Sequence, residues 1–338
     1  LSLDPRYNEM LGFTQDEVNV LMKEAGIDPD MIRVDMEYLY NGYLFHRKGK
    51  NKVYNPSMML YLFDQVSKFG DEVENIIDDN LKTDYSRLQM LMQNEDNRKQ
   101  LVQIIENNYI ESELISKFPL DKFHDSEYFV SLLYYLGMLT VDGTEDGLLR
   151  LKVPNYSIQT IYWGYIKEMT KEDNPDVLIN MDQQRIALRE LAYRGNPSPF
   201  VEHISENIFK RLSNRDIIAF DEKYIKIIIL NGLFQSNLYV TVSELEVSSG
   251  YADIYMHRNP AIPDIPYEWV WEIKYVKKKD ASGSVLKTKR EEARIQLKKY
   301  RDSYRFAGRT DVHYLSLIFI GKDRYEMEIM NDEFRDTM

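Results

Sequence analysis

The segment that most constrains the fold is Tyr267–Tyr275, YEWVWEIKY, whose aromatic and β-branched residues predict a β-strand. Successive side chains of a strand point to opposite faces, so Glu272 and Lys274 share one face. A second strand is predicted at Ala252–Met256, and a proline-rich turn follows it at 260–266. If the two strands pair antiparallel through this turn, Asp253 lies close to Glu272. Two carboxylates and an ammonium then share one small volume, and carboxylate oxygens suit Mg²⁺ or Mn²⁺.

Composition narrows the class of protein. The chain has 338 residues, enough for two or three domains, with 43% hydrophobic and 29% charged residues. It has no apolar run of the roughly 20 residues that a membrane span needs, so we expect a soluble, cytoplasmic protein. The absence of cysteine excludes disulfides, cysteine zinc sites and thiol catalysis. The chain begins at Leu1 without a signal peptide, and we expect it to be a fragment. The five histidines show no metal-ligand spacing and are interpreted as surface or packing residues: His46, His124, His203, His257 and His313.

Charge is distributed unevenly along the chain. The net charge is −12, which argues against indiscriminate nucleic-acid binding. Between Glu272 and Arg309, however, 13 Lys or Arg face 5 Asp or Glu, a local charge of +8 that leaves −20 for the remainder. A basic surface is therefore confined to the neighbourhood of the acid–lysine pair, where it suits a phosphate backbone.

The first two-thirds of the chain read as mainly helical. Thr14 is expected to cap a helix ending near Glu24, and a helix is expected to start after Asn55-Pro56. Between them, turn signals predict a hairpin-like element over residues 38–54. Further helices are predicted at 80–108 and through the polar connector 171–215, which Gly195–Pro199 interrupts. A helix at 128–137, strands at 138–141 and 148–153, and a helix at 158–169 together predict a winged-helix-like unit, which binds DNA or only packs.

The last third alternates between helices and strands. The predicted elements are a helix at 222–233, strands at 238–242, 252–256 and 268–276, a helix at 286–306 and a strand at 312–320. This order, αβββαβ, predicts an α/β architecture with a mixed sheet flanked by helices.

Six residues in this order resemble the motifs of the PD-(D/E)xK nuclease superfamily, whose core is restriction-endonuclease-like. Asp253 in GYAD resembles the family's GxxD, and Glu272-Ile273-Lys274 resembles its E-x-K. In the flanking helices, Glu222 resembles the acid of the first helix, while Gln296 and Tyr300 resemble a Q-x-x-x-Y motif and share one helix face.

The resemblance implies a role for each of these residues. Asp253, Glu272 and the Ile273 carbonyl would hold Mg²⁺ or Mn²⁺, with Glu222 completing the shell. Lys274 would orient or activate a water molecule, and Gln296 and Tyr300 would position the phosphate or Lys274. Basic side chains of the long helix would contact the DNA backbone: Arg294, Lys298, Lys299 and Arg301.

The upstream region resembles a second family. Tyr40-Asn41-Gly42-Tyr43 and Val53-Tyr54-Asn55-Pro56 are similar to the lid motifs of the bacterial AAA-ATPase-like family fused to such nucleases, although Asn41 replaces the usual Asp. No G-x-x-x-x-G-K-[ST] loop is present, so we do not expect the chain to hydrolyse ATP by itself. The predicted divisions are a lid-like segment at 1–92, a helical and winged-helix-like region at 93–214, and a nuclease-like domain at 215–338.

Two functional hypotheses follow. The first is a Mg²⁺-dependent nuclease that hydrolyses DNA rather than RNA, working with an upstream ATPase-like module. The alternative is an inactive nuclease-like module that binds nucleic acid or protein and regulates that ATPase. Taken singly, Glu272 and Lys274 also fit an exposed ion pair, and Trp269 and Trp271 fit core anchors. Further alternatives stay open for Lys277–Lys279, as a solvated run or a DNA contact, and for Glu244 and Glu246, as metal neighbours or strand-edge residues.

Overall fold

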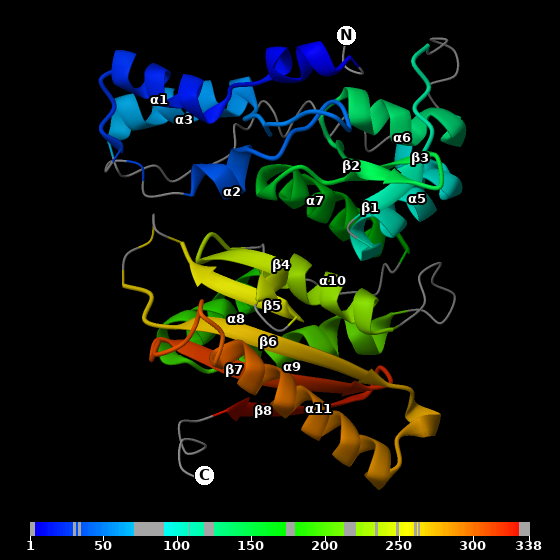
Figure 1. Cartoon of the computed structure of the whole chain (residues 1–338). Helices are drawn as coiled ribbons and strands as arrows, with labels where there is room; N and C mark the ends of the chain where they lie inside the picture. The colour runs from blue at the N-terminus through cyan, green and yellow to red at the C-terminus, as the bar shows by residue number, and fades with distance from the viewer. Residues whose placement is uncertain are drawn as a thin grey trace. The chain divides into compact units, whose positions relative to one another are not determined.

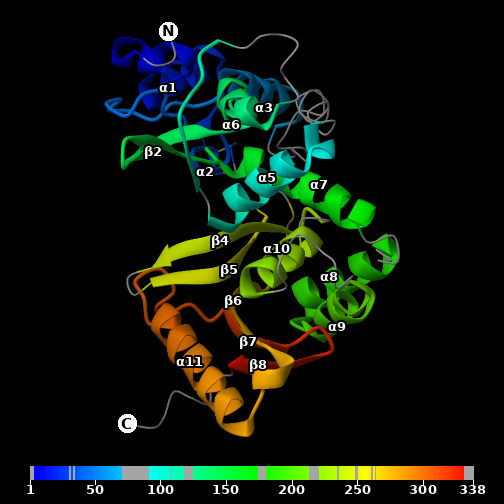
Figure 2. The same ribbon diagram turned by 90° about the vertical axis from the view of Figure 1, so that its right-hand side faces the viewer.

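The computed structural model describes residues 4–29, 32, 35–70, 91–107, 109–117, 125–173, 180–212, 221–233, 236–247, 250–259, 262 and 264–330. The chain forms two compact units, residues 1–169 and 170–338, which are described separately below (Figures 1 and 2). In neither unit does a described helix combine the length and the apolar character that a membrane span requires.

The first unit is mainly helical, with one small sheet. Its elements in chain order are η1 (Pro5–Leu11), α1 (Gln15–Glu24), α2 (Met36–Tyr40), α3 (Pro56–Phe69), α5 (Glu95–Asn107), β1 (Tyr109–Ser112), α6 (Ser126–Tyr135), β2 (Thr140–Glu145), β3 (Leu148–Lys152) and α7 (Tyr156–Asp173).

Local capping explains where the first helices start. The Thr14 side chain accepts a hydrogen bond from the Glu17 backbone, and the Glu17 carboxylate accepts one from Thr14 N at 2.8 Å. Asn55 caps α3 by accepting from Met58 N at 3.1 Å. Both predicted helix starts are therefore confirmed, because each short polar side chain satisfies an amide that the helix itself leaves unpaired.

The hairpin-like element is shorter than predicted. Residues 36–40 form α2, where Asp35 accepts from Tyr38 N and starts a helical turn. Pairing is limited to an isolated bridge between Tyr43 and Val53, whose backbone groups exchange hydrogen bonds of 3.2 and 2.9 Å. The cap at Asp35 thus starts a helix in a segment whose aromatic residues and turn signals had predicted part of a hairpin.

The predicted order of helix, hairpin and helix is present in α6, β2, β3 and α7. A third strand, β1, was not predicted; it pairs antiparallel with β3 and gives the order β1-β3-β2. The helix predicted over 80–108 appears as α5 from residue 95, and residues 80–90 lie outside the described residues.

The second unit contains a five-stranded mixed sheet. Its order is β4-β5-β6-β7-β8; β6 and β7 are parallel and the other neighbours antiparallel. The elements are α8 (Met181–Arg194), α9 (Ser198–Asn207), η5 (Phe209–Arg211), α10 (Glu222–Leu233), β4 (Tyr239–Val247), β5 (Gly250–Arg258), β6 (Glu268–Val276), η6 (Lys278–Asp280), α11 (Gly283–Arg301), β7 (Val312–Ile320) and β8 (Arg324–Met330). The predicted mixed sheet with flanking helices is confirmed, and β8 adds an edge strand beyond the predicted end.

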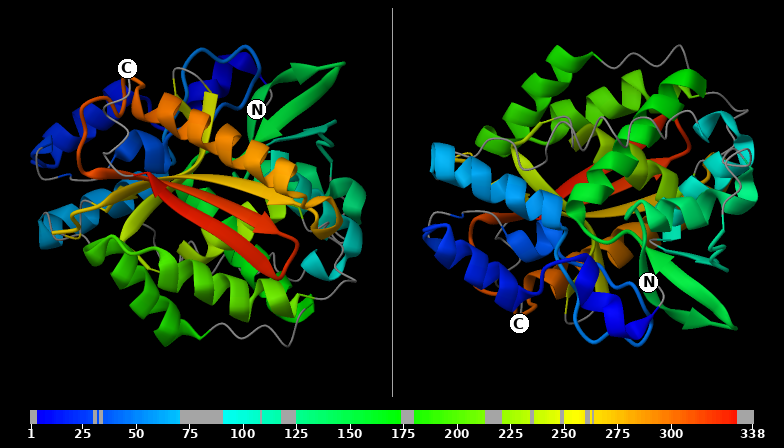
Figure 3. Two further views of the ribbon diagram at one scale, coloured as in Figure 1. Left: turned by 90° about the horizontal axis from the view of Figure 1, so that it is seen from below. Right: turned by 90° about the horizontal axis from the view of Figure 1, so that it is seen from above.

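Helices cover both faces of this sheet. Figure 3 shows α11 along one face and α8, α9 and α10 along the other. On the latter face Trp269 donates to the Leu191 carbonyl at 3.3 Å, and the Trp271 ring lies 6.0 Å from that of Phe200. Both tryptophans are fully buried, so their interpretation as core anchors is confirmed. These contacts also explain why α8 and α9 belong to the second unit, whereas the predicted boundary lay after them, near residue 214.

Candidate active site

The acid–lysine pair predicted on β6 is buried. Glu272 is only 1% exposed, and its Oε1 lies 2.7 Å from the Lys274 ammonium, whose side chain is 12% exposed. The two residues are two positions apart on one strand, which puts both on the same face. The arrangement is therefore not the exposed surface ion pair that was the alternative interpretation.

Asp253 reaches the same place from β5. The strands β5 and β6 pair antiparallel through Ile254 and Trp271, as predicted. Beyond that pair, the Asp253 carboxylate accepts from the Ile273 backbone amide at 2.8 Å. The antiparallel pairing thus brings Asp253 alongside the residue that follows Glu272.

Helix α10 contributes two charged side chains to the site. Glu222 accepts from the Tyr275 amide at 3.1 Å and lies 3.8 Å from the Lys274 ammonium. One turn later on the same helix, the Lys226 ammonium lies 3.4 Å from the Asp253 carboxylate, and both side chains are 14% exposed. Lys226 was not predicted; its spacing of four residues from Glu222, which places both on one helix face, is the signal that identifies it.

Tyr300 connects α11 to the acids. Its hydroxyl lies 3.1 Å from Glu272 Oε2 and 2.7 Å from the Tyr251 carbonyl. The Tyr300 hydroxyl has one proton and two acceptors, the Glu272 carboxylate and the Tyr251 carbonyl, and it donates to both in this geometry. Gln296 lies one turn earlier on α11 and is half-buried, and no hydrogen bond joins its amide to these acids within the described chain.

The site perturbs the titration of its own groups. Burial raises the pKa of Glu272 to about 7, and the negative charge of Asp253 acts in the same direction. Burial likewise raises the pKa of Glu222, against the lowering effect of Lys274. Burial alone would lower the pKa of Lys274, but the adjacent Glu272 carboxylate outweighs it and the pKa is raised. Strong perturbation of several neighbouring groups is typical of functional sites.

The donor atoms suit a divalent cation, but they are engaged with lysines. Asp253, Glu272 and the Ile273 carbonyl offer the hard oxygen ligands that Mg²⁺ and Mn²⁺ prefer. Each carboxylate instead contacts an ammonium, that of Lys226 or Lys274. Among the described residues, no three His, Cys, Asp or Glu side chains gather closely enough to hold a metal ion. A cation entering here would displace these ammonium groups.

The basic side chains of α11 fall into two groups. Arg294 forms a two-pronged pair with Glu328 of β8 at 2.7 and 3.0 Å, and Arg301 pairs with Asp302 at 3.0 Å. Lys298 and Lys299 are exposed and form no ion pair within the described chain. These two lysines are therefore better suited to a phosphate backbone than the two arginines. Of the run Lys277–Lys279, Lys278 pairs with Asp323 at 2.6 Å.

Comparison with known proteins assigns this region. A family model described as the PD-(D/E)XK nuclease superfamily matches residues 220–329, from the start of α10 into β8. The matched segment contains all six residues predicted from the motifs. Residues 220–329 are therefore similar to this superfamily, whose members are generally nucleases, and the mixed sheet between helices is consistent with its restriction-endonuclease-like fold. No curated protein matches the chain.

Proposed function

We propose that the second unit is a metal-dependent nuclease that hydrolyses DNA phosphodiester bonds. One observation carries the proposal: within the segment that matches the family, the buried pair of Glu272 and Lys274 stands beside Asp253 of the neighbouring strand. In this proposal Asp253, Glu272 and the Ile273 carbonyl hold Mg²⁺ or Mn²⁺, and Glu222 lies in the outer shell.

The side chains divide the chemical work. A bound divalent cation would polarise the scissile phosphate and lower the pKa of a water molecule. Lys274 carries a positive charge at neutral pH, so it orients the attacking water and stabilises negative charge that develops on the phosphate. Glu222 holds the Tyr275 amide and limits the movement of Lys274, while Tyr300 fixes the Glu272 carboxyl. Gln296 is proposed to contact the phosphate from α11.

The test is cleavage of labelled single-stranded DNA, double-stranded DNA and RNA with Mg²⁺ or Mn²⁺. Lys274→Met and Asp253→Asn should each reduce the rate about 10²- to 10³-fold, since each removes a group aimed at the reacting phosphate. Lys278→Met is the matched control, because this lysine is 76% exposed and pairs with Asp323 rather than with one of the three site carboxylates. Cleavage that persists in both site variants would refute the assignment.

DNA is the proposed substrate, and RNA is the alternative that the cleavage test includes. The exposed Lys298 and Lys299 supply a sequence-independent contact that either backbone satisfies. Comparing the three substrates with one preparation decides between them, and Lys298→Met with Lys299→Met should weaken binding and reduce its salt dependence.

A second function is supported by the ion pairs themselves. Because Lys226 and Lys274 already neutralise Asp253 and Glu272, the site is also suited to a module that binds nucleic acid or protein without cutting. Mn²⁺ titration by calorimetry separates the two functions. Failure of the intact site to bind millimolar Mn²⁺, together with retained DNA binding, supports the non-cleaving module.

The upstream ATPase-like partner is a further proposal, resting on the motifs around Tyr43 and Asn55. Its test is ATP turnover by a protein that contains both parts, with and without DNA. Turnover that is unaffected by residues 1–338 would contradict a regulatory role.

A further inference from the structure

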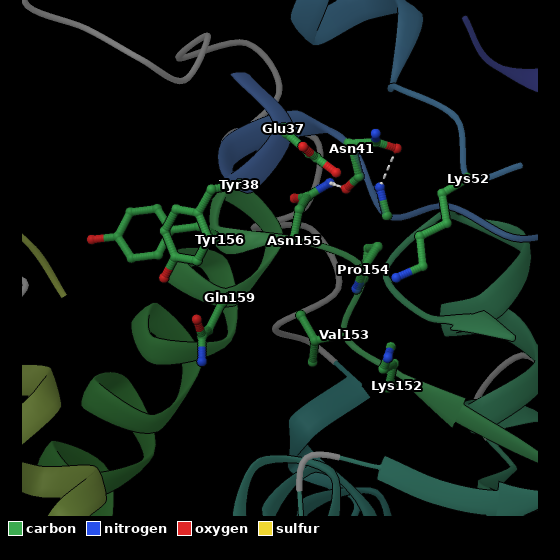
Figure 4. A pocket seen from close by; sticks show the side chains of 11 residues that line it. Glu37, Tyr38, Asn41, Lys52, Lys152, Val153, Pro154, Asn155, Tyr156 and Gln159 are labelled. Carbon is green, nitrogen blue, oxygen red and sulfur yellow. Dashed lines mark hydrogen bonds between the residues drawn. The ribbon is translucent and has the colours of Figure 1, made fainter. Parts of the chain in front are cut away.

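The first unit contains a pocket that the nuclease proposal does not use. It has a volume of about 340 Å³, within the range of roughly 300 to 1,000 Å³ found for small-molecule sites. Its walls come from α2 and the residues after it, from the end of β3 and from the start of α7 (Figure 4). All of the lining residues belong to residues 1–169, so the pocket lies within one compact unit.

The shape of the pocket depends on close contact between residues 41–42 and residues 154–155. The Asn155 amide donates to the Asn41 carbonyl at 3.0 Å, and its oxygen accepts from Ile158 N at 3.1 Å, which caps α7. Gly42 has a φ of +110°, and a Cβ built on it would lie 2.0 Å from the Pro154 carbonyl oxygen. Only glycine permits this approach, so the wall is held by geometry that a side chain would disrupt.

The two ends of the pocket differ in chemistry. At one end the rings of Tyr38 and Tyr156 lie 5.2 Å apart with an interplanar angle of 32°. At the other end Figure 4 shows Lys52 and Lys152, with the Asn41–Asn155 pair between the two ends. An aromatic wall accepts a planar ring, and a pair of lysines accepts an anion.

The charges identify which lysine is available to a ligand. Lys152 pairs with Asp142, which does not line the pocket. Lys52 is exposed and forms no ion pair among the residues that the structure describes. The positive end of α7, a helix of 18 residues, also lies at this pocket, because Tyr156 and Gln159 of its first turn line it. Glu37, at the rim, offers an acceptor for hydroxyl or amino groups.

We propose that this pocket binds one nucleotide unit, an aromatic base joined through a sugar to a phosphate. The base would lie against Tyr38, and the phosphate would contact Lys52. The unit comes either from a free nucleotide or from an unpaired position of a DNA strand, because both present the same base and phosphate. This proposal is independent of the cleavage chemistry assigned to the second unit.

The experiment measures binding by the full chain in EDTA, so that no divalent cation supports cleavage. The probes are dAMP, deoxyadenosine and inorganic phosphate by calorimetry, and a labelled dT oligonucleotide by fluorescence anisotropy. We expect saturable binding of dAMP or of the oligonucleotide, with deoxyadenosine and phosphate each at least tenfold weaker than dAMP when dAMP binds. Lys52→Met and Tyr38→Leu should each reduce binding at least tenfold. Competition between dAMP and the oligonucleotide indicates a strand as the source, and dAMP binding without competition indicates a free nucleotide.

Two controls keep the test independent of folding and of the nuclease site. Lys48→Met removes an exposed lysine that does not line the pocket and should leave binding unchanged. Lys274→Met should reduce cleavage about 10²- to 10³-fold yet leave dAMP binding intact, so the two proposals fail separately. Thermal melts confirm that each variant is folded. Absence of binding by both dAMP and the oligonucleotide, or binding that Lys52→Met and Tyr38→Leu leave unchanged, overturns the proposal.

Discussion

Glu268 is predicted to stabilise the second unit strongly. It opens β6 and is 1% exposed, yet its carboxylate has four polar partners. Tyr255 OH donates to it at 2.6 Å, His257 Nδ1 lies 2.7 Å away, and the Arg258 and Arg309 guanidinium groups donate at 3.0 and 2.8 Å. A buried charge with this many donors is stable only while all of them remain in place.

The magnitude follows from the pKa. Burial by itself raises the pKa of Glu268, but the hydrogen bonds from His257 and Tyr255 and the charge of Arg309 outweigh it and lower the pKa to about 2. Relative to the ordinary value of 4.5, a shift of this size corresponds to about 3 kcal/mol of stability. Because the folded pKa is the lower one, this stability is fully present above about pH 4.5 and is lost as the pH falls toward 2.

The perturbation is Glu268→Gln, which keeps the shape and removes the charge. The new amide NH₂ group would face Arg258 or Arg309, which can only donate, so a guanidinium loses its acceptor. We expect a loss of about 3 kcal/mol in the free energy of unfolding at pH 7. The difference from the unsubstituted protein should shrink on acidification through pH 4.5.

The assay is urea unfolding monitored by tryptophan fluorescence. Of the three tryptophans, Trp269 and Trp271 lie in β6, so a Trp163→Phe background reports the second unit alone. Glu328→Gln is the matched control: it removes the charge from the pair with Arg294, whose side chains are 33% and 41% exposed, and should change stability by less than about 1 kcal/mol. A loss no larger than that of the control, or one independent of pH, would refute the reasoning.

Two further predictions concern the other parts of the molecule. Gly42→Ala should destabilise the first unit by about 2 kcal/mol or more, because Gly42 has a positive φ and the added Cβ would clash with Pro154. Gly164→Ala in α7 has nothing within 4 Å of the added Cβ and should instead stabilise this unit by about 0.5 to 1 kcal/mol. Thermal melts measure both changes, and equal effects of the two substitutions would contradict the clash. Lys226→Met should increase Mn²⁺ affinity roughly tenfold, measured by calorimetry, because it removes a competing cation from Asp253. Lys298→Met is the control and should leave the Mn²⁺ affinity unchanged. Weaker Mn²⁺ binding by Lys226→Met would mean that Lys226 supports the metal site.

Strands that are buried in the sheet were predicted more accurately than the exposed edge strand. The strands predicted at 268–276 and 312–320 have the same bounds in the structure, because both are rich in aromatic and β-branched residues and most of their side chains are buried, on both faces of the sheet. β8 was missed although Tyr325, Met327 and Ile329 alternate with acids. Its residues are at most half-buried, as befits an edge strand, and its two glutamates find their partners only once α11 lies across the sheet.

For the site, the sequence predicted which residues take part but not all of the contacts between them. The spacing of Glu272 and Lys274, and the order of Asp253 before them, predicted that these residues meet. The sequence did not predict which lysine each acid would contact, because that depends on how α10 docks against the strands. Lys226 reaches Asp253 only through this docking, and the Tyr251 carbonyl meets Tyr300 only because α11 crosses the end of β5.

These pairings determine what a metal ion would be needed for. The site holds three carboxyl groups, Glu222, Asp253 and Glu272, against two ammonium groups, Lys226 and Lys274. With the pKa of Glu272 at about 7, its proton offsets much of the remaining negative charge near neutral pH. The acids are therefore compensated by groups of the chain itself, and the folded state does not depend on a cation for neutrality. In the proposed nuclease, metal binding at this site would thus serve the reaction rather than the fold, in contrast to structural metal centres, where removal of the metal unfolds the domain.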